Sequence, residues 1–129
     1  MAAFEFSLAD VPSDPELWLQ HASGFILFED VRNYALERLD PALGPETRAL
    51  VVKAVNDALY GLMMVIDGVS GVLRREEIKV ELSVTARLLR GDEVTAELDL
   101  RDGDGMCMGY HGWLEGDFGT DPIAIPRDP

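Results

Sequence analysis

The stretch "IKVELSVTARLLRGDEVTAELDLR", residues 78–101, decides the predicted fold, because apolar and polar side chains alternate along it. Apolar residues occupy every second position from Ile78 to Leu88 and again from Val94 to Leu100. This is the period of a strand that buries one face. "RGD" at 90–92 favours the tight turn of an antiparallel hairpin between them. Residues 78–100 therefore predict two paired strands whose apolar face needs a cover.

Two long helices are the predicted cover, over about residues 14–39 and 45–66, where apolar residues recur at steps of three and four. Ser13 with Glu16 resembles a capping box before the first helix. Gly24 inside that helix is expected to break or kink it. The second helix is predicted to stop at Asp67-Gly68, with Gly68 as a left-handed cap.

The second helix carries no charge in "ALYGLMMVI", residues 58–66. A helix that is apolar all round is buried on most sides, or is covered by another chain. The second alternative predicts a homodimer whose interface includes Tyr60, Met63 and Met64. Gly61 is then expected to mark the close approach of another backbone.

A glycine-rich stretch, "DGDGMCMGYHGWLEGDFG" at 102–119, follows the two strands. Its Asp-Gly pairs predict a hairpin turn, and the alternation in "MCMGYHGWL" predicts a third strand over 106–114. The chain is thus predicted to be one α+β domain over residues 1–129. Two long helices pack on one face of a three- to four-stranded antiparallel β-meander, with or without residues 3–8 as an edge strand.

The net charge of −13 excludes nucleic acids and anionic membranes as direct partners and is compatible with a basic protein partner. Simple solubility explains the same charge. The chain has one cysteine and no apolar run of the roughly 20 residues that a membrane-spanning helix needs. Its first residues also lack the basic segment followed by an apolar segment that marks a secretory signal. These features favour a cytoplasmic location.

The glycine-rich stretch matches no metal or cofactor motif. Neither calcium-loop register through "DGDG" supplies the required oxygen ligands, because His111 or Met106 falls where a carboxylate is needed. The nitrogen and sulfur ligands of the whole chain are His21, His111 and Cys107, and a strand would separate the last two by roughly 13 Å. We therefore predict no metal and no cofactor, and no Cys107–His111 pair.

One set of polar and aromatic residues remains as an enzyme or ligand-site alternative, with His111 as an acid/base oriented by a carboxylate. It needs the end of the third strand to lie beside the second helix. Its members are Asp57, Tyr60, Asp67, His111, Trp113, Glu115 and Asp117.

The leading hypothesis is a non-enzymatic protein-binding module, immunity-like, inhibitor-like or regulatory. Size, charge and the lack of a catalytic motif fit the general profile of small acidic bacterial proteins that neutralise toxins or bind partners. Residues 99–121 hold six acidic residues and one arginine, which suits a basic partner. The predicted anchors and charges of that surface are Tyr110, Trp113, Phe118, Asp102, Asp104, Glu115 and Asp117. A homodimeric structural protein is the remaining alternative.

Overall fold

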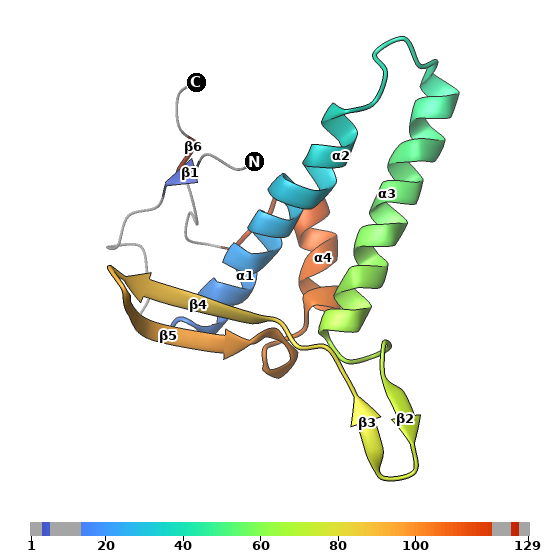
Figure 1. Ribbon diagram of the computed structural model, residues 1–129. Helices are drawn as coiled ribbons and strands as arrows, with labels where there is room; N and C mark the ends of the chain where they lie inside the picture. Colours follow the sequence, from blue (N-terminus) through green and yellow to red (C-terminus); the bar gives the residue numbers. More distant parts are fainter. Residues whose placement is uncertain (1–3, 6–13, 120–124, 127–129) are drawn as a thin grey trace.

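The computed structural model describes residues 4–5, 14–119 and 125–126, and its mixed helices and strands confirm an α+β protein. Figure 1 shows a group of helices beside two hairpins, one against the helices and one projecting from them. The elements are, in chain order, β1 (Phe4–Glu5), α1 (Glu16–Leu27), the π-helical turn η2 (Phe28–Arg32), α2 (Asn33–Glu37), α3 (Pro45–Ile66), β2 (Leu73–Arg75), β3 (Ile78–Val80), β4 (Thr85–Arg90), β5 (Glu93–Asp99), the 3-10 turn η3 (Leu100–Asp102), α4 (Met106–Leu114) and β6 (Ile125–Pro126).

The first predicted helix is one helical segment made of α1, η2 and α2. Gly24 does not break it, so that expectation was wrong. The reason for glycine there is space: a Cβ at Gly24 would lie 2.5 Å from the ring of Trp113. The irregularity comes later, at η2, where π-type turns widen the helix by one residue. Ser13 lies outside the described residues, and Asp14 instead accepts a hydrogen bond from the amide of Glu16 at 3.4 Å.

The second predicted helix is confirmed as α3, with Pro45 in its first turn. It ends where the sequence predicted, and Gly68 has φ +77°. The amide of Val69 donates to the carbonyl of Met64 at 3.0 Å, and the amide of Gly68 donates to that of Val65 at 3.1 Å. This pair of bonds is a Schellman motif, which satisfies the last carbonyl groups of the helix.

The strands of the described residues form three two-stranded antiparallel sheets, which differs from the predicted meander. The hairpin around "RGD" is confirmed as β4–β5, in which Arg90 pairs with Glu93. The expected single strand from Ile78 to Leu88 divides in two, because β3 pairs with β2 and β4 pairs with β5. β1 pairs with β6, and residues 6–8 of the expected edge strand lie outside the described residues.

The predicted third strand is the helix α4, and the predicted "DGDG" hairpin turn is the 3-10 turn and loop that lead into it. Met106, Tyr110 and Trp113 are its buried residues, at helical spacing. The carboxylate of Asp67 fixes the start of α4 by accepting from the amides of Met106 (2.7 Å) and Cys107 (2.8 Å). A cap from 39 residues away is a tertiary contact that no local pattern predicts.

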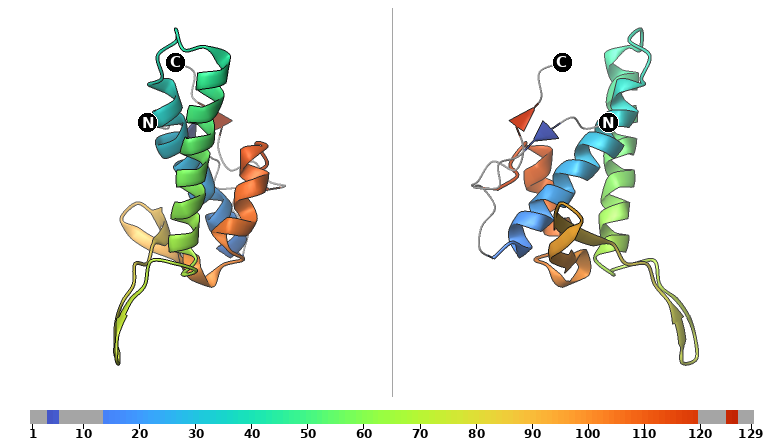
Figure 2. Two further views of the ribbon diagram at one scale, coloured as in Figure 1. Left: turned by 90° about the vertical axis from the view of Figure 1, so that its right-hand side faces the viewer. Right: turned by 60° about the vertical axis from the view of Figure 1, so that its left-hand side comes forward.

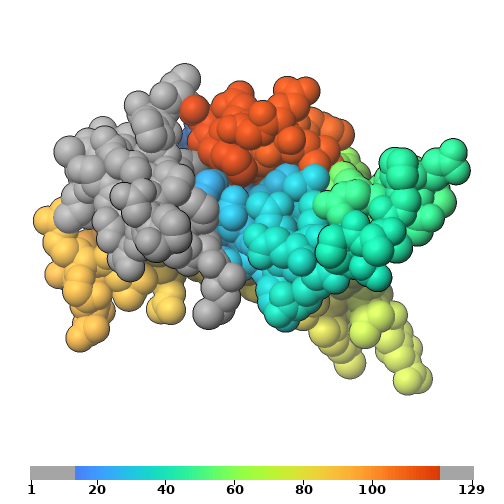
Figure 3. All heavy atoms as spheres, turned by 90° about the horizontal axis from the view of Figure 1, so that it is seen from above, coloured from blue at the N-terminus to red at the C-terminus, as the bar shows by residue number. Residues whose placement is uncertain are grey.

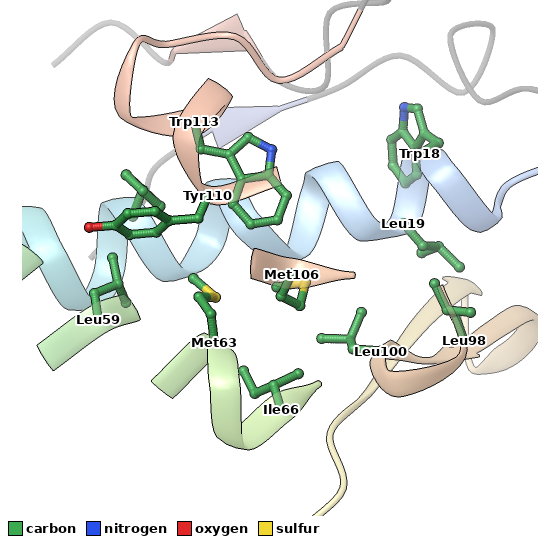
Figure 4. Close-up of a cluster of buried hydrophobic side chains, with 11 residues drawn as sticks. Trp18, Leu19, Leu59, Met63, Ile66, Leu98, Leu100, Met106, Tyr110 and Trp113 are labelled. Carbon is green, nitrogen blue, oxygen red and sulfur yellow. The ribbon is translucent and has the colours of Figure 1, made fainter. Parts of the chain in front are cut away.

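The core lies where α1, α3 and α4 meet and continues under the β4–β5 hairpin through Leu98 and Leu100 (Figure 4). Met63 and Met106 are fully enclosed at its centre. This arrangement leaves one face of α3 and the whole β2–β3 hairpin outside the core (Figures 1 and 2).

Candidate functional site

An exposed feature of the described residues is the segment 69–84, which contains β2 and β3 and which we call the arm. All views show it leaving the end of α3 and projecting clear of the helices (Figures 1 and 2). Seen along another direction, it stands apart at one corner of the molecule (Figure 3). Every residue of β2 and β3 is exposed, so no described part of the chain covers either face of this hairpin.

The register of the arm divides its side chains between two faces. Leu73 pairs with Val80 and Arg75 with Ile78, while Arg74 pairs with Lys79. Directly opposed residues point to the same side of an antiparallel pair. One face is therefore mainly apolar, and Leu73, Ile78 and Val80 on it are 70%, 72% and 55% exposed. The other face carries two like charges in opposition, which is unfavourable in isolation.

The base of the arm is attached to the body by Arg101. Its guanidinium group pairs with Glu81 at 2.7 Å and donates to the carbonyl of Leu82 at 3.1 Å. Lys79 also approaches Glu81, at 3.1 Å. The hydrogen bonds from Arg101 and then from Lys79 lower the pKa of Glu81. The arm is thus oriented at its base and uncovered along its length.

A second cluster joins the end of α3 to the start of α4, and it contains part of the predicted enzyme site. The thiol of Cys107 is hydrogen-bonded to Asp67 and Tyr60. Burial, followed by the contact with Asp67, raises the pKa of Cys107. The hydrogen bond between Tyr60 and Cys107 is also the main cause of the raised pKa of Tyr60. This direction is opposite to that of a nucleophilic cysteine, which needs a lowered pKa.

His111 lies on α4 one turn after Cys107, not about 13 Å from it as a strand would require. Its ring contacts Tyr60 and Tyr110, at centroid distances of 5.8 and 5.5 Å. His111 and Asp57 line one open groove of about 660 Å³ between α3 and α4. Asp57 is paired there with Lys53 at 2.5 Å, and Asp67 caps α4. The structure thus brings members of the predicted set together, but the carboxylates have other partners.

Trp113 lies apart from that set and is part of the core. It is 2% exposed, and its indole N–H donates to Nδ1 of His21 at 2.9 Å. Its ring stacks on Phe118 at 6.4 Å. Tyr110 is also buried, and its hydroxyl donates to the carbonyl of Asn56 at 2.8 Å. Trp113 and Tyr110 are therefore unavailable as surface anchors, which corrects that expectation; Phe118 is half-buried.

The predicted acidic residues do reach the surface, in two places. Asp102 and Asp104 line a small cleft of about 190 Å³ together with Asp14 and Glu16, at the start of α1. Glu115 and Asp117 are exposed after the end of α4. These carboxylates are accessible to a cation, and a basic partner remains a prediction for this surface.

The predicted interface residues on α3 also differ in how far they are buried. Met63 is fully buried in the core of its own chain, so it is unavailable to a second chain. Tyr60 and Met64 are half-buried. A Cβ at Gly61 would meet no atom within 4 Å, so no described backbone approaches it in this chain.

α3 is also long and apolar enough to cross a membrane, with a mean hydropathy of 1.6 over 18 residues, of which 17% are buried. Core helices of soluble proteins can be equally long and apolar, so this is weak evidence for a membrane. Among the residues that the structure describes, no three His, Cys, Asp or Glu side chains are placed to hold a metal ion.

Sequence reasoning missed two residues that organise the loop before α4. Gln20 is buried on α1, donates to the carbonyl of Gly105 at 3.0 Å, and accepts from the amide of Asp104 at 2.7 Å. His21, the next residue, accepts from Trp113. Gln20 and His21 are polar residues within the apolar stretch "LWLQHA", which could have indicated a buried polar contact. The neighbouring sequence does not identify the partners of these two residues.

Comparisons with known proteins add no identification, since no family model, curated protein or solved structure matches this chain.

Proposed function

We propose that the protein is a non-catalytic protein-binding module and that the arm is its binding surface. The observation that carries the proposal is the exposure of Leu73, Ile78 and Val80 on a hairpin that no described part of the chain covers. An isolated two-stranded hairpin is at best marginally stable in water. A partner that covers the apolar face supplies the missing stabilisation.

The chemistry of the arm specifies the kind of partner. Within the described residues β2 and β3 pair only with each other, so the outer edge of each strand lacks a partner strand there. The edge groups can bond to water or to an added strand, whereas the apolar face needs an apolar cover. The partner class is therefore a protein with an apolar surface.

The surroundings of the candidate catalytic groups also favour binding over catalysis. His111 is bordered by the Tyr60 and Tyr110 rings, and burial and then Asp67 raise the pKa of the Cys107 thiol. General acid–base catalysis needs a donor and acceptor directed at a common reacting atom. The carboxylates nearest to these groups are occupied by Lys53 and by the start of α4.

The test is to compare an arm variant, Ile78→Ser with Val80→Ser, against the control Met108→Ser. Met108 is 77% exposed and lies on α4, not on the arm. Proteins that co-purify with the wild type are identified, purified and titrated separately against each variant. We expect the arm variant to bind at least about tenfold more weakly, because each buried side chain contributes about 1.5–3 kcal/mol.

Equal affinity of the arm variant and the control for the purified partner would contradict the proposal. Salt is not expected to weaken binding, because the arm carries three acidic and three basic residues. Strong weakening by salt would indicate that binding uses the acidic cleft at Asp102 and Asp104 instead.

A further inference from the structure

The outer face of α3 is a second apolar surface and runs into the arm. Leu50, Ala54, Ala58, Gly61 and Val65 follow one another at steps of four, four, three and four, which places them on one stripe of the helix. We call these five residues the α3 stripe. Leu50 is 70% exposed, and Ala54 and Ala58 are exposed too. The stripe contains no charge and faces away from the buried Leu59, Met63 and Ile66.

The α3 stripe and the arm form one continuous surface. The Schellman motif directs the chain from the end of α3 into the arm at Val69, which is exposed. Gly71, at the start of the arm, lies against Val65, the last residue of the stripe: a Cβ there would be 3.2 Å from its side chain. The arm then projects beyond the end of α3 (Figures 1 and 2). A partner seated on the stripe is thus adjacent to the arm.

Charge distinguishes the partner that suits this surface. The chain has a net charge of −13, yet the arm has three charges of each sign and the stripe has none. A strongly basic partner gains most at acidic surfaces elsewhere. A second copy of this acidic chain is repelled by most of the surface and least here. Glu46, one turn before Leu50, and Arg74 and Arg75 of the arm offer opposite charges between copies.

The dimensions agree with a symmetric pair. From Gly71 to the turn at Glu76 the arm extends for about 17 Å, and the first half of α3, residues 45–56, is about 18 Å long. A standard interface covers about 800 Å² on each partner.

We propose that a second copy of the chain occupies this surface in a two-fold symmetric dimer. The α3 stripes pack antiparallel, and each arm lies along the first half of α3 in the other copy. The contact is isologous, so each arm covers the other copy's stripe and is covered in return. Close packing of the helices at the stripe uses the absence of a side chain at Gly61. The inference rests on the proposed function and names the polypeptide that the arm binds.

A bilayer suits α3 less well than a second copy does. Lys53 and Asp57 form an exposed ion pair in the middle of the helix, beside the stripe. Charged groups are costly at the centre of a bilayer, whereas they remain in water at the rim of a protein interface.

The test is the mass of the wild-type protein by sedimentation equilibrium over a range of concentrations and salt. We expect a mass of twice 14.2 kDa, with dissociation on dilution. We also expect tighter association in high salt, because salt screens the repulsion between two acidic chains. Ala58→Glu, which places like charges opposite each other, is expected to weaken dimerisation by about a hundredfold. Met108→Glu adds the same charge outside the surface and is expected to leave it unchanged.

Several outcomes overturn the dimer. One is a wild-type mass of a single chain at every concentration, with or without binding to phosphatidylcholine vesicles. Another is a dimer that tolerates both Ala58→Glu and the arm variant Ile78→Ser with Val80→Ser, when circular dichroism shows folded variants. If the wild type is monomeric but the arm variant still loses a different purified protein, the second copy is wrong and the binding role of the arm stands.

Discussion

Trp113 and Ile78 are both large apolar residues, but the first is buried and the second is exposed. Trp113 is enclosed on all sides: Gly24 and Gly109 leave room for its ring, Phe28 and Phe118 contact it, and His21 accepts its N–H. Ile78 lies on the arm, where no described residue covers it. The first region is fixed by contacts within the chain. The second has apolar surface that no described residue buries.

Because of this difference, substitutions in the two regions are expected to change different quantities. A change in the Trp113 region removes contacts that exist in the single chain, so its effect appears in the free energy of unfolding. Under the proposed association, a change in the arm removes contacts between chains, so its effect is expected in an association constant. Variants in the two regions can distinguish these effects, and the largest expected change in stability is at Trp113.

Trp113→Ala is expected to lower the free energy of unfolding by about 3–5 kcal/mol, the usual cost of removing a large buried aromatic side chain. It also leaves His21 without its donor and opens a cavity against Gly24. The measurement is urea denaturation followed by circular dichroism. A loss below about 1 kcal/mol would mean that Trp113 is not enclosed in solution as it is in the structure.

Stability is expected to fall as the pH is lowered through the titration of His21. Burial lowers the pKa of His21 from 6.5, although Asp117 and Asp104 act in the opposite direction. The unfolded chain then binds the proton more readily than the folded chain does. The contribution of neutral His21 is therefore present above about pH 6.5 and is lost as the pH falls through the folded-state pKa. Protonation of Nδ1 also removes the acceptor for Trp113.

His21→Gln is the matched control for the pH prediction, since an amide oxygen can accept from Trp113 without titrating in this range. The quantity to follow is the difference in unfolding free energy between wild type and variant, because carboxylate titrations common to both cancel. A difference that grows in favour of the wild type at low pH would contradict the assigned direction.

The contrast between the regions also explains how far the sequence predicts the fold. The end of α3 at Gly68 and the β4–β5 turn at Gly91 were predicted because each depends on a few neighbouring residues. The helix α4 was wrongly predicted as a strand. "MCMGYHGWL" fits both periods, since Met106, Tyr110 and Trp113 recur at helical spacing within an alternating pattern. The decision between the two lies with Asp67, far away in the sequence.

The candidate site was predicted less well than the fold, for the same reason. Aromatic residues mark both cores and interfaces, so composition could not place Trp113 and Tyr110 inside. Residues 78–80 alternate like the residues of β4, and their pattern gives no sign that they belong to an uncovered hairpin. Burial depends on which elements pack together, and that information lies in the tertiary structure.

The smallest expected change in stability is that of the arm variant, Ile78→Ser with Val80→Ser. At concentrations where the chain is a monomer, we expect its free energy of unfolding to lie within about 0.5 kcal/mol of the wild type, as for most surface substitutions. The reason is that neither side chain is buried in the single chain. As the concentration is raised, the wild type gains stability by association and the variant does not. The measurement is the thermal midpoint against protein concentration, with Met108→Ser as the control that should follow the wild type. A large loss of stability in the dilute variant would show that the arm packs against its own chain, and the distinction between the two regions would then be wrong.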